Sequence, residues 1–149
     1  MNITNLRKLK RYVLAEPRRY YQGYWLLDKK SDVVEDQKPP CGTAGCLAGL
    51  AALMEGYVLH HTNGDAQGEY QRVSKPRGKK TFNVESLAME ILGLTQHQAD
   101  QLFEASGMGW PNETGMMLRA AQNPKKAAQA AAAAIDILIA REQAKRSKK

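Results

Sequence analysis

Apolar residues recur three or four positions apart in five stretches of the chain, the spacing that one buried face of an α-helix requires. In the first stretch we expect Thr4 to cap a helix and Pro17 to follow its end. The buried positions of this helix are predicted to be Leu6, Leu9 and Val13. The residues between them are mostly basic and are expected to face solvent.

The second stretch has the clearest helical pattern in the sequence. We expect Thr43 to be its N-cap and Gly56 to end it in the left-handed conformation. Its buried positions are predicted to be Leu47, Leu50, Ala51 and Met54. Residues 57–59 then favour a strand, a turn is expected at residues 62–65, and residues 71–80 are expected to form an exposed basic loop.

Three more helices are expected in the second half of the chain. One spans residues 83–92 and ends at Gly93, and the next opens with a capping-box pattern at residues 95–98 and reaches Gly107. The last begins at the Asn-Pro pair of residues 123–124, a cap followed by proline at the first helical position. The inward positions of these last two helices are predicted to be Ala99, Leu102, Phe103, Ala127, Ala128, Ala131, Ile135, Leu138 and Ile139.

These elements predict a mainly α protein, a compact bundle of about five helices with a small β element (α+β). We expect a single domain over residues 1–149, with a basic flexible tail from about residue 145. No apolar segment follows the basic N-terminus, and the longest apolar run, residues 127–140, is too short to span a bilayer. Two cysteines do not make a disulfide framework. We therefore expect a cytoplasmic protein without membrane contact, and its oligomeric state stays open.

Charge alternates in blocks along the chain and sums to +7. Residues 1–30 carry eight basic and two acidic side chains, or +6, and residues 119–149 carry the same numbers. Residues 72–80 hold five basic side chains and no acid: Arg72, Lys75, Arg77, Lys79 and Lys80. The two blocks between these, residues 31–71 and 81–118, each sum to −5. Basic ends and an acidic middle favour a partner of mixed charge over bare duplex DNA, although charge runs are most often solvated faces.

A segment rich in small residues precedes the second helix, and its residues of interest are Cys41, Gly42, Thr43, Cys46 and Gly49. A thiol at a helix N-terminus lies near unpaired amides, which stabilise a thiolate. Such a thiol suits a nucleophile, a redox pair or a metal ligand, and His60 and His61 are candidates to complete a site. The spacing fits no ordinary zinc pattern, so no metal is assigned. The alternative is that both cysteines are small buried side chains in closely packed structure.

The run Cys-Gly-Thr-Ala-Gly-Cys-x-x-Gly at residues 41–49 follows an aromatic, tryptophan-containing segment and resembles the core motif of a family of small uncharacterised phage and bacterial proteins. Residues 92–103 and 123–128 are similar to later stretches of that family, so the resemblance covers roughly residues 20–140. It implies a phage or mobile-element setting, with the host cytoplasm as the location. It implies no activity for particular residues, and residues 57–80 look longer than the family pattern.

Arginines and aromatic residues are concentrated after the first helix, at Arg18, Arg19, Tyr20, Tyr21, Tyr24 and Trp25. Cations beside stacking surfaces suit an acidic partner or single-stranded nucleic acid. We predict that these residues, together with Trp110 in a glycine-rich break, are surface anchors for a partner. The alternative is that the aromatic residues fill the core while both arginines face water.

Residues 84–107 have the length of a helix-turn-helix motif. Side chains that could read base edges there are Gln96, His97, Gln98 and Gln101. The segment contains acids but no lysine or arginine to offset phosphate repulsion, which favours an ordinary pair of packed helices.

No sequence pattern identifies a reaction, since the P-loop, dinucleotide, zinc-protease and serine-hydrolase motifs are absent. We therefore predict a small non-enzymatic binding protein without a cofactor, which contacts a protein partner or sequesters a small ligand. One alternative is nucleic-acid binding through the basic ends and residues 72–80. The other is a thiol- or zinc-dependent activity at Cys41 and Cys46.

Overall fold

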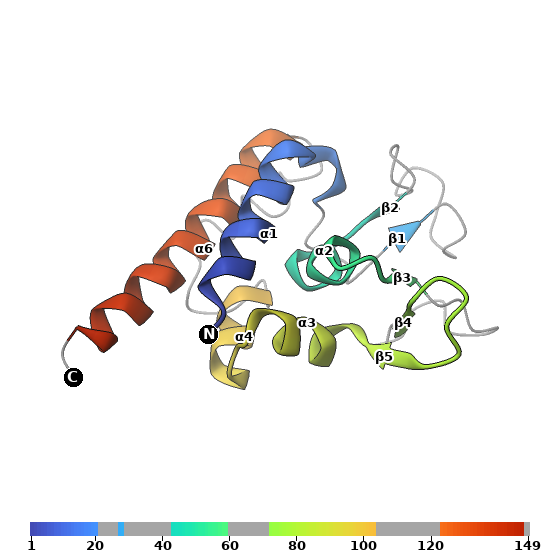
Figure 1. The fold of residues 1–149 in the computed structure, drawn as a ribbon. Coiled ribbons are helices and arrows are strands. Elements are labelled where there is room, and N and C mark those ends of the chain that lie inside the picture. Colours follow the sequence, from blue (N-terminus) through green and yellow to red (C-terminus); the bar gives the residue numbers. More distant parts are fainter. Residues whose placement is uncertain (21–26, 29–42, 60–71, 104–122, 148–149) are drawn as a thin grey trace.

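The first and last helices of the chain, α1 (Ile3–Ala15) and α6 (Pro124–Arg146), lie side by side and run in opposite directions (Figure 1). The structure, a computed structural model, describes residues 1–20, 27–28, 43–59, 72–103 and 123–147. These two helices come from the two ends of the chain, which carry its largest positive charge. The apolar residues of both helices belong to one hydrophobic core.

Helix α1 begins two residues earlier than the sequence predicts. The side-chain oxygen of Asn2 accepts a hydrogen bond from the backbone N–H of Asn5 at 3.1 Å, which makes Asn2 the N-cap. The expectation that Thr4 caps this helix is therefore wrong, because Thr4 already lies in its first turn. The helix ends at Ala15, and a single 3₁₀ turn over Pro17–Arg19 follows.

Helix α6 begins as its sequence predicts. The side chain of Asn123 accepts a hydrogen bond from the backbone N–H of Lys126 at 3.1 Å, and Pro124 occupies the first helical position. The expected inward residues of this helix are all buried. The helix extends through Arg146, so Lys145 belongs to its last turn and not to a flexible tail.

The central helix, α2 (Leu47–Met54), packs against both α1 and α3. Its first six residues are all buried, and Gly56 follows its end with a φ of 76°, as expected. The expectation that Thr43 caps this helix is wrong. Cys46 occupies the N-cap position, because Thr43 is drawn into strand β2 (Thr43–Ala44).

Helices α3 (Val84–Leu92) and α4 (Gln96–Phe103) form the layer below α2 (Figure 1). Asn83 caps α3, and Gly93 ends it with a φ of 60°. Helix α4 opens with the predicted capping box. In that box the Thr95 N–H donates to the side chain of Gln98 at 3.0 Å, and the Gln98 N–H donates to the Thr95 hydroxyl at 3.4 Å.

The β structure consists of two small antiparallel sheets. Strand β1 (Leu27–Asp28) pairs with β2, and β3 (Val58–Leu59), β4 (Arg72–Ser74) and β5 (Thr81–Asn83) form a second sheet in that order. The strand expected at residues 57–59 is thus confirmed. The exposed loop expected over residues 71–80 is wrong for β4, because Val73 and Ser74 are buried in the pairing with β5. With five α-helices among the described residues and two small sheets, the predicted mainly α fold is confirmed.

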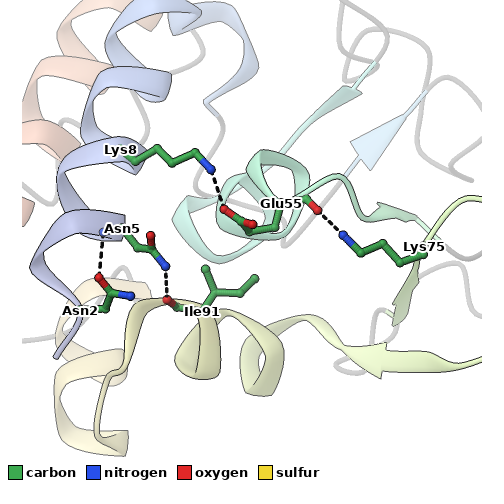
Figure 2. A network of polar contacts seen from close by, with 6 residues as sticks. All are labelled: Asn2, Asn5, Lys8, Glu55, Lys75 and Ile91. Atoms are coloured by element: carbon green, nitrogen blue, oxygen red, sulfur yellow. Dashed lines mark hydrogen bonds and ion pairs between the residues drawn. The ribbon is translucent and has the colours of Figure 1, made fainter.

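The start of α1 is held at the end of α3 by backbone and side-chain hydrogen bonds. The Asn2 N–H donates to the Leu92 carbonyl at 2.8 Å. The Asn5 side-chain amide donates to the Ile91 carbonyl at 2.7 Å (Figure 2). These carbonyls belong to the last turn of α3, where intrahelical partners are missing. The contact therefore satisfies both helix ends and brings the backbone of Asn2 close to Gly93.

We predict that Gly93→Ala destabilises the protein more than Gly56→Ala. Both glycines have positive φ, which costs an alanine about 1–2 kcal/mol. A Cβ at Gly93 would lie 2.9 Å from the Asn2 nitrogen, whereas at Gly56 its nearest neighbour is the end of a lysine side chain at 3.8 Å. Urea unfolding of both variants measures the difference. Equal losses of unfolding free energy would contradict the close approach of α1 to α3.

Candidate functional site

Cys46 is enclosed at the junction of the 3₁₀ turn, strand β2 and helix α2. The Gly45 N–H donates to the Arg19 carbonyl at 2.9 Å, and Tyr20 forms a parallel bridge with Gly45. This pairing places the buried Tyr20 beside Cys46, whose side chain is 2% exposed. The motif residues that the structure describes thus close the core around the start of α2.

Burial raises the pKa of the Cys46 thiol to about 11. The backbone N–H groups of Gly49 and Ala48 favour the thiolate, and the charge of Glu85 opposes it. The helix N-terminus therefore does not produce the reactive thiolate that such a position can give, because the loss of water outweighs the amides. Burial also raises the pKa of Tyr20 well above its usual range, and the neighbouring Cys46 adds to the shift.

The described residues do not include the full set of candidate metal ligands. Cys41 and Gly42 lie outside them, as do His60 and His61. Within the described ranges, no group of three or more histidine, cysteine or acidic side chains is placed to hold a metal ion. Within the motif, Gly49 is buried inside α2.

Tyr20 is not a surface anchor. It is 4% exposed and belongs to the hydrophobic core, because the bridge to Gly45 turns it inward. Arg19 is half-buried, and its guanidinium donates to the Tyr12 hydroxyl at 2.7 Å, so it joins the 3₁₀ turn to α1. The remaining predicted anchors lie outside the described residues: Tyr21, Tyr24, Trp25 and Trp110.

A groove lies where the end of α1 meets the start of α6. Its volume is about 510 Å³, and it is open to solvent. Arg18, predicted from the sequence as a contact residue, lines it, and Lys125 lies on the α6 side. The other lining residues are Leu14, Pro17, Asn123, Pro124 and Gln129.

The outward face of α1 is basic, as the sequence predicts for the residues between its apolar positions. Lys8 forms an ion pair with Glu55 at 2.7 Å, and Lys10 forms one with Asp136 at 2.5 Å. Viewed around the helix axis, Arg7 and Arg11 lie between these two lysines, one helical turn apart. Both arginines are exposed, and neither has a polar partner among the described residues. The apolar residues Leu6, Leu9 and Val13 occupy the opposite, buried face. The sequence indicates an amphipathic helix without acidic residues, but it does not reveal that Glu55 and Asp136 pair with two of its lysines.

The five basic residues predicted at positions 72–80 are all exposed on the β4–β5 hairpin. Arg72 donates to the Thr81 hydroxyl at 2.8 Å across the two strands. The ammonium group of Lys75 lies 4.2 Å from the ring centre of Tyr57, and that of Lys80 lies 4.9 Å from Phe82. These cation–π contacts hold the two lysines at the ends of the turn that joins the strands. Arg77 and Lys79 lie in the middle of the same turn.

The polar side chains of helices α3 and α4 contact one another, as in an ordinary pair of packed helices. The Gln96 amide donates to Glu85 at 3.1 Å and to Asp100 at 2.8 Å. Gln101 lies 3.1 Å from the His97 ring nitrogen. These candidate base-reading side chains are thus engaged with acids and with each other, which favours the packed-helix interpretation.

No known family, curated protein or solved structure matches this chain. None of the helices in the described ranges is both long and apolar enough to cross a membrane.

We predict that Cys46 does not react with Ellman's reagent while the protein is folded. With a pKa of about 11, its thiolate fraction near pH 8 is about one in a thousand, and burial blocks access as well. The measurement uses a Cys41→Ser variant, in which Cys46 is the remaining thiol. Fast labelling of the native variant at the rate of the urea-unfolded chain would contradict the enclosed site.

We also predict that stability falls as the pH rises from about 9 to about 11. In this interval the thiol of the unfolded chain loses its proton while folded Cys46 keeps it, so the unfolded state binds fewer protons and gains stability. The expected loss is on the order of 2 kcal/mol. Urea unfolding across this range should show a shallower decline for Cys46→Ala, in which only Tyr20 of the pair still titrates. Identical declines would contradict the pKa shift.

Proposed function

We propose that the protein is a small non-enzymatic binding protein that contacts a negatively charged macromolecule through the outward face of α1. One observation carries this proposal. Arg7 and Arg11 stand between two lysines that are already paired with acids, and they have no polar partner of their own in the described part of the chain. Such cations are available to an external anion without the loss of an existing contact.

The extent of the basic surface supports a macromolecule over a small ligand. Arg7 and Arg11 lie along the helix before the groove that Arg18 and Lys125 line, so basic residues follow the length of α1. The groove is open and does not enclose a ligand on all sides, as small-molecule sites usually do. An extended anionic surface fits this row of cations better than a compact metabolite does.

The enzymatic alternative receives no support from the described residues. Cys46 is buried, with a raised pKa, and no cluster of metal ligands surrounds it within those residues. A thiol- or zinc-dependent activity that uses Cys41 stays a prediction, as do the phage setting and the cytoplasmic location.

We predict that Arg7→Glu with Arg11→Glu lowers the salt concentration at which the protein elutes from immobilised heparin, a defined polyanion. The matched control is Arg141→Glu with Lys145→Glu, which changes the net charge equally at two exposed positions near the other end of α6. The control should elute close to the unmodified protein, because local charge on α1 and not net charge determines retention. Equal shifts for both double variants would contradict a binding face on α1.

A further inference from the structure

Two basic elements far apart in the sequence meet at the same acidic residue. Lys8 on α1 reaches the carboxylate of Glu55 at the end of α2, and Lys75 on the β4–β5 hairpin donates to the backbone carbonyl of Glu55. Figure 2 shows the two lysines approaching Glu55 from opposite sides. The end of α2 therefore connects the basic face of α1 to the basic hairpin.

Both elements are free of acids in their own sequences. Helix α1 and the hairpin segment, residues 72–83, together contain nine cations: Arg7, Lys8, Lys10, Arg11, Arg72, Lys75, Arg77, Lys79 and Lys80. Neither Arg77 nor Lys79 has a polar partner among the described residues, and both are exposed. Each element thus presents two cations that make no hydrogen bond, ion pair or ring contact within the described ranges: Arg7 and Arg11 on α1, and Arg77 and Lys79 on the hairpin.

The hairpin holds its basic turn in a defined shape. The Gly78 N–H donates to the Lys75 carbonyl at 2.8 Å, and Arg77 adopts a left-handed backbone with a φ of 62°. Behind the turn, the Tyr57 and Phe82 rings pack edge to face with centres 5.6 Å apart, beneath Lys75 and Lys80. Cations on an ordered turn lose less conformational freedom on binding than cations on a loose chain do.

We propose that α1 and the β4–β5 hairpin form one surface that binds the phosphate backbone of a nucleic acid. The inference rests on the proposed function and assigns the partner of the same α1 face. Arg7 and Arg11 would contact one stretch of phosphates, and Arg77 and Lys79 another. Glu55 lies between the two elements and contacts one lysine of each.

The composition of this surface favours nucleic acid over an acidic protein. Protein–protein interfaces are built around apolar and aromatic anchors and are poor in lysine. In the described part of the chain, the large apolar side chains that are well exposed are Leu14, Val58 and Ile137, and they come from three different elements. A surface that contains lysine and arginine with little apolar area between them instead has the composition typical of phosphate contacts.

The salt dependence of binding to a short mixed-sequence duplex DNA tests the proposal. DNA affinity falls as salt rises, and each phosphate contact makes the slope of log affinity against log salt concentration steeper by about 0.9. Arg7→Ala with Arg11→Ala should make this slope shallower by about 1.8, and so should Arg77→Ala with Lys79→Ala. The four substitutions together should make it shallower by about 3.6, because the same DNA touches both elements. Alanine is favourable in a helix, and all four side chains are exposed, so the fold should persist.

The control variant, Arg141→Ala with Lys145→Ala, should leave the slope unchanged. A loss confined to the α1 pair would overturn the joint surface and leave the proposed function standing. No loss from either pair would overturn both, and an equal loss from the control would show binding by net charge alone. If poly-glutamate competes as well as unlabelled DNA at equal charge, the partner is an acidic protein and the nucleic-acid assignment is wrong.

A substitution at the junction gives a test of opposite sign. Glu55→Gln removes a negative charge from the surface and releases Lys8, while the backbone contact to Lys75 stays. DNA affinity should therefore rise by a few-fold. Glu142→Gln, which releases Arg146 from a comparable pair at the far end of α6, should have no effect. Unchanged or weaker binding of Glu55→Gln would overturn the placement of DNA across the junction.

Discussion

The docking of α1 onto three other helices is the constraint on which the remaining structure depends. Its first turn satisfies the last carbonyls of α3, through Asn2 and Asn5. Its apolar face closes the core, and Lys8 and Lys10 reach acids on α2 and α6. An exposed ion pair contributes little stability, commonly below about 1 kcal/mol, so these two pairs matter more for charge than for folding. They neutralise the flanks of α1 and leave the central arginines uncompensated.

This arrangement changes the meaning of the charge blocks along the chain. When the blocks are taken in sequence order, the basic ends and the acidic middle favour a partner of mixed charge. In three dimensions α1 and α6 become neighbours, and Glu55 joins α1 to the basic hairpin. Basic residues that are dispersed in the sequence thus belong to elements that contact one another, which is why we propose a polyanionic partner.

Local signals in the sequence were sufficient for most helices but not for the site. Asn83, Gly93, the Thr95–Gln98 capping box and Asn123 act through neighbours three or four residues away, and all four were predictable. Thr43 failed as a cap because pairing with Asp28 in another strand draws it away from the helix. Such a competition is decided by tertiary contacts, which one sequence does not reveal.

The same distinction explains the candidate residues. The sequence predicts Tyr20 as a surface anchor, with a place in the core as the alternative, and the structure shows it buried in the core and bridged to Gly45. Cys46 was ambiguous between a thiolate and a buried thiol, since helix position and burial act in opposite directions; burial is the larger effect. The Lys8–Glu55 pair joins residues 47 positions apart, a contact that no local pattern indicates.

The most direct test of the account is an NMR titration of the isotope-labelled protein with a short duplex DNA. We expect the largest shifts at the side-chain Nε–H groups of Arg7 and Arg11 and at the backbone amides of Lys75 and residues 77–80. The signals of Arg141 and Lys145 should stay in place. Shifts concentrated on the last turns of α6, or spread evenly over all exposed cations, would contradict a binding surface built from α1 and the hairpin.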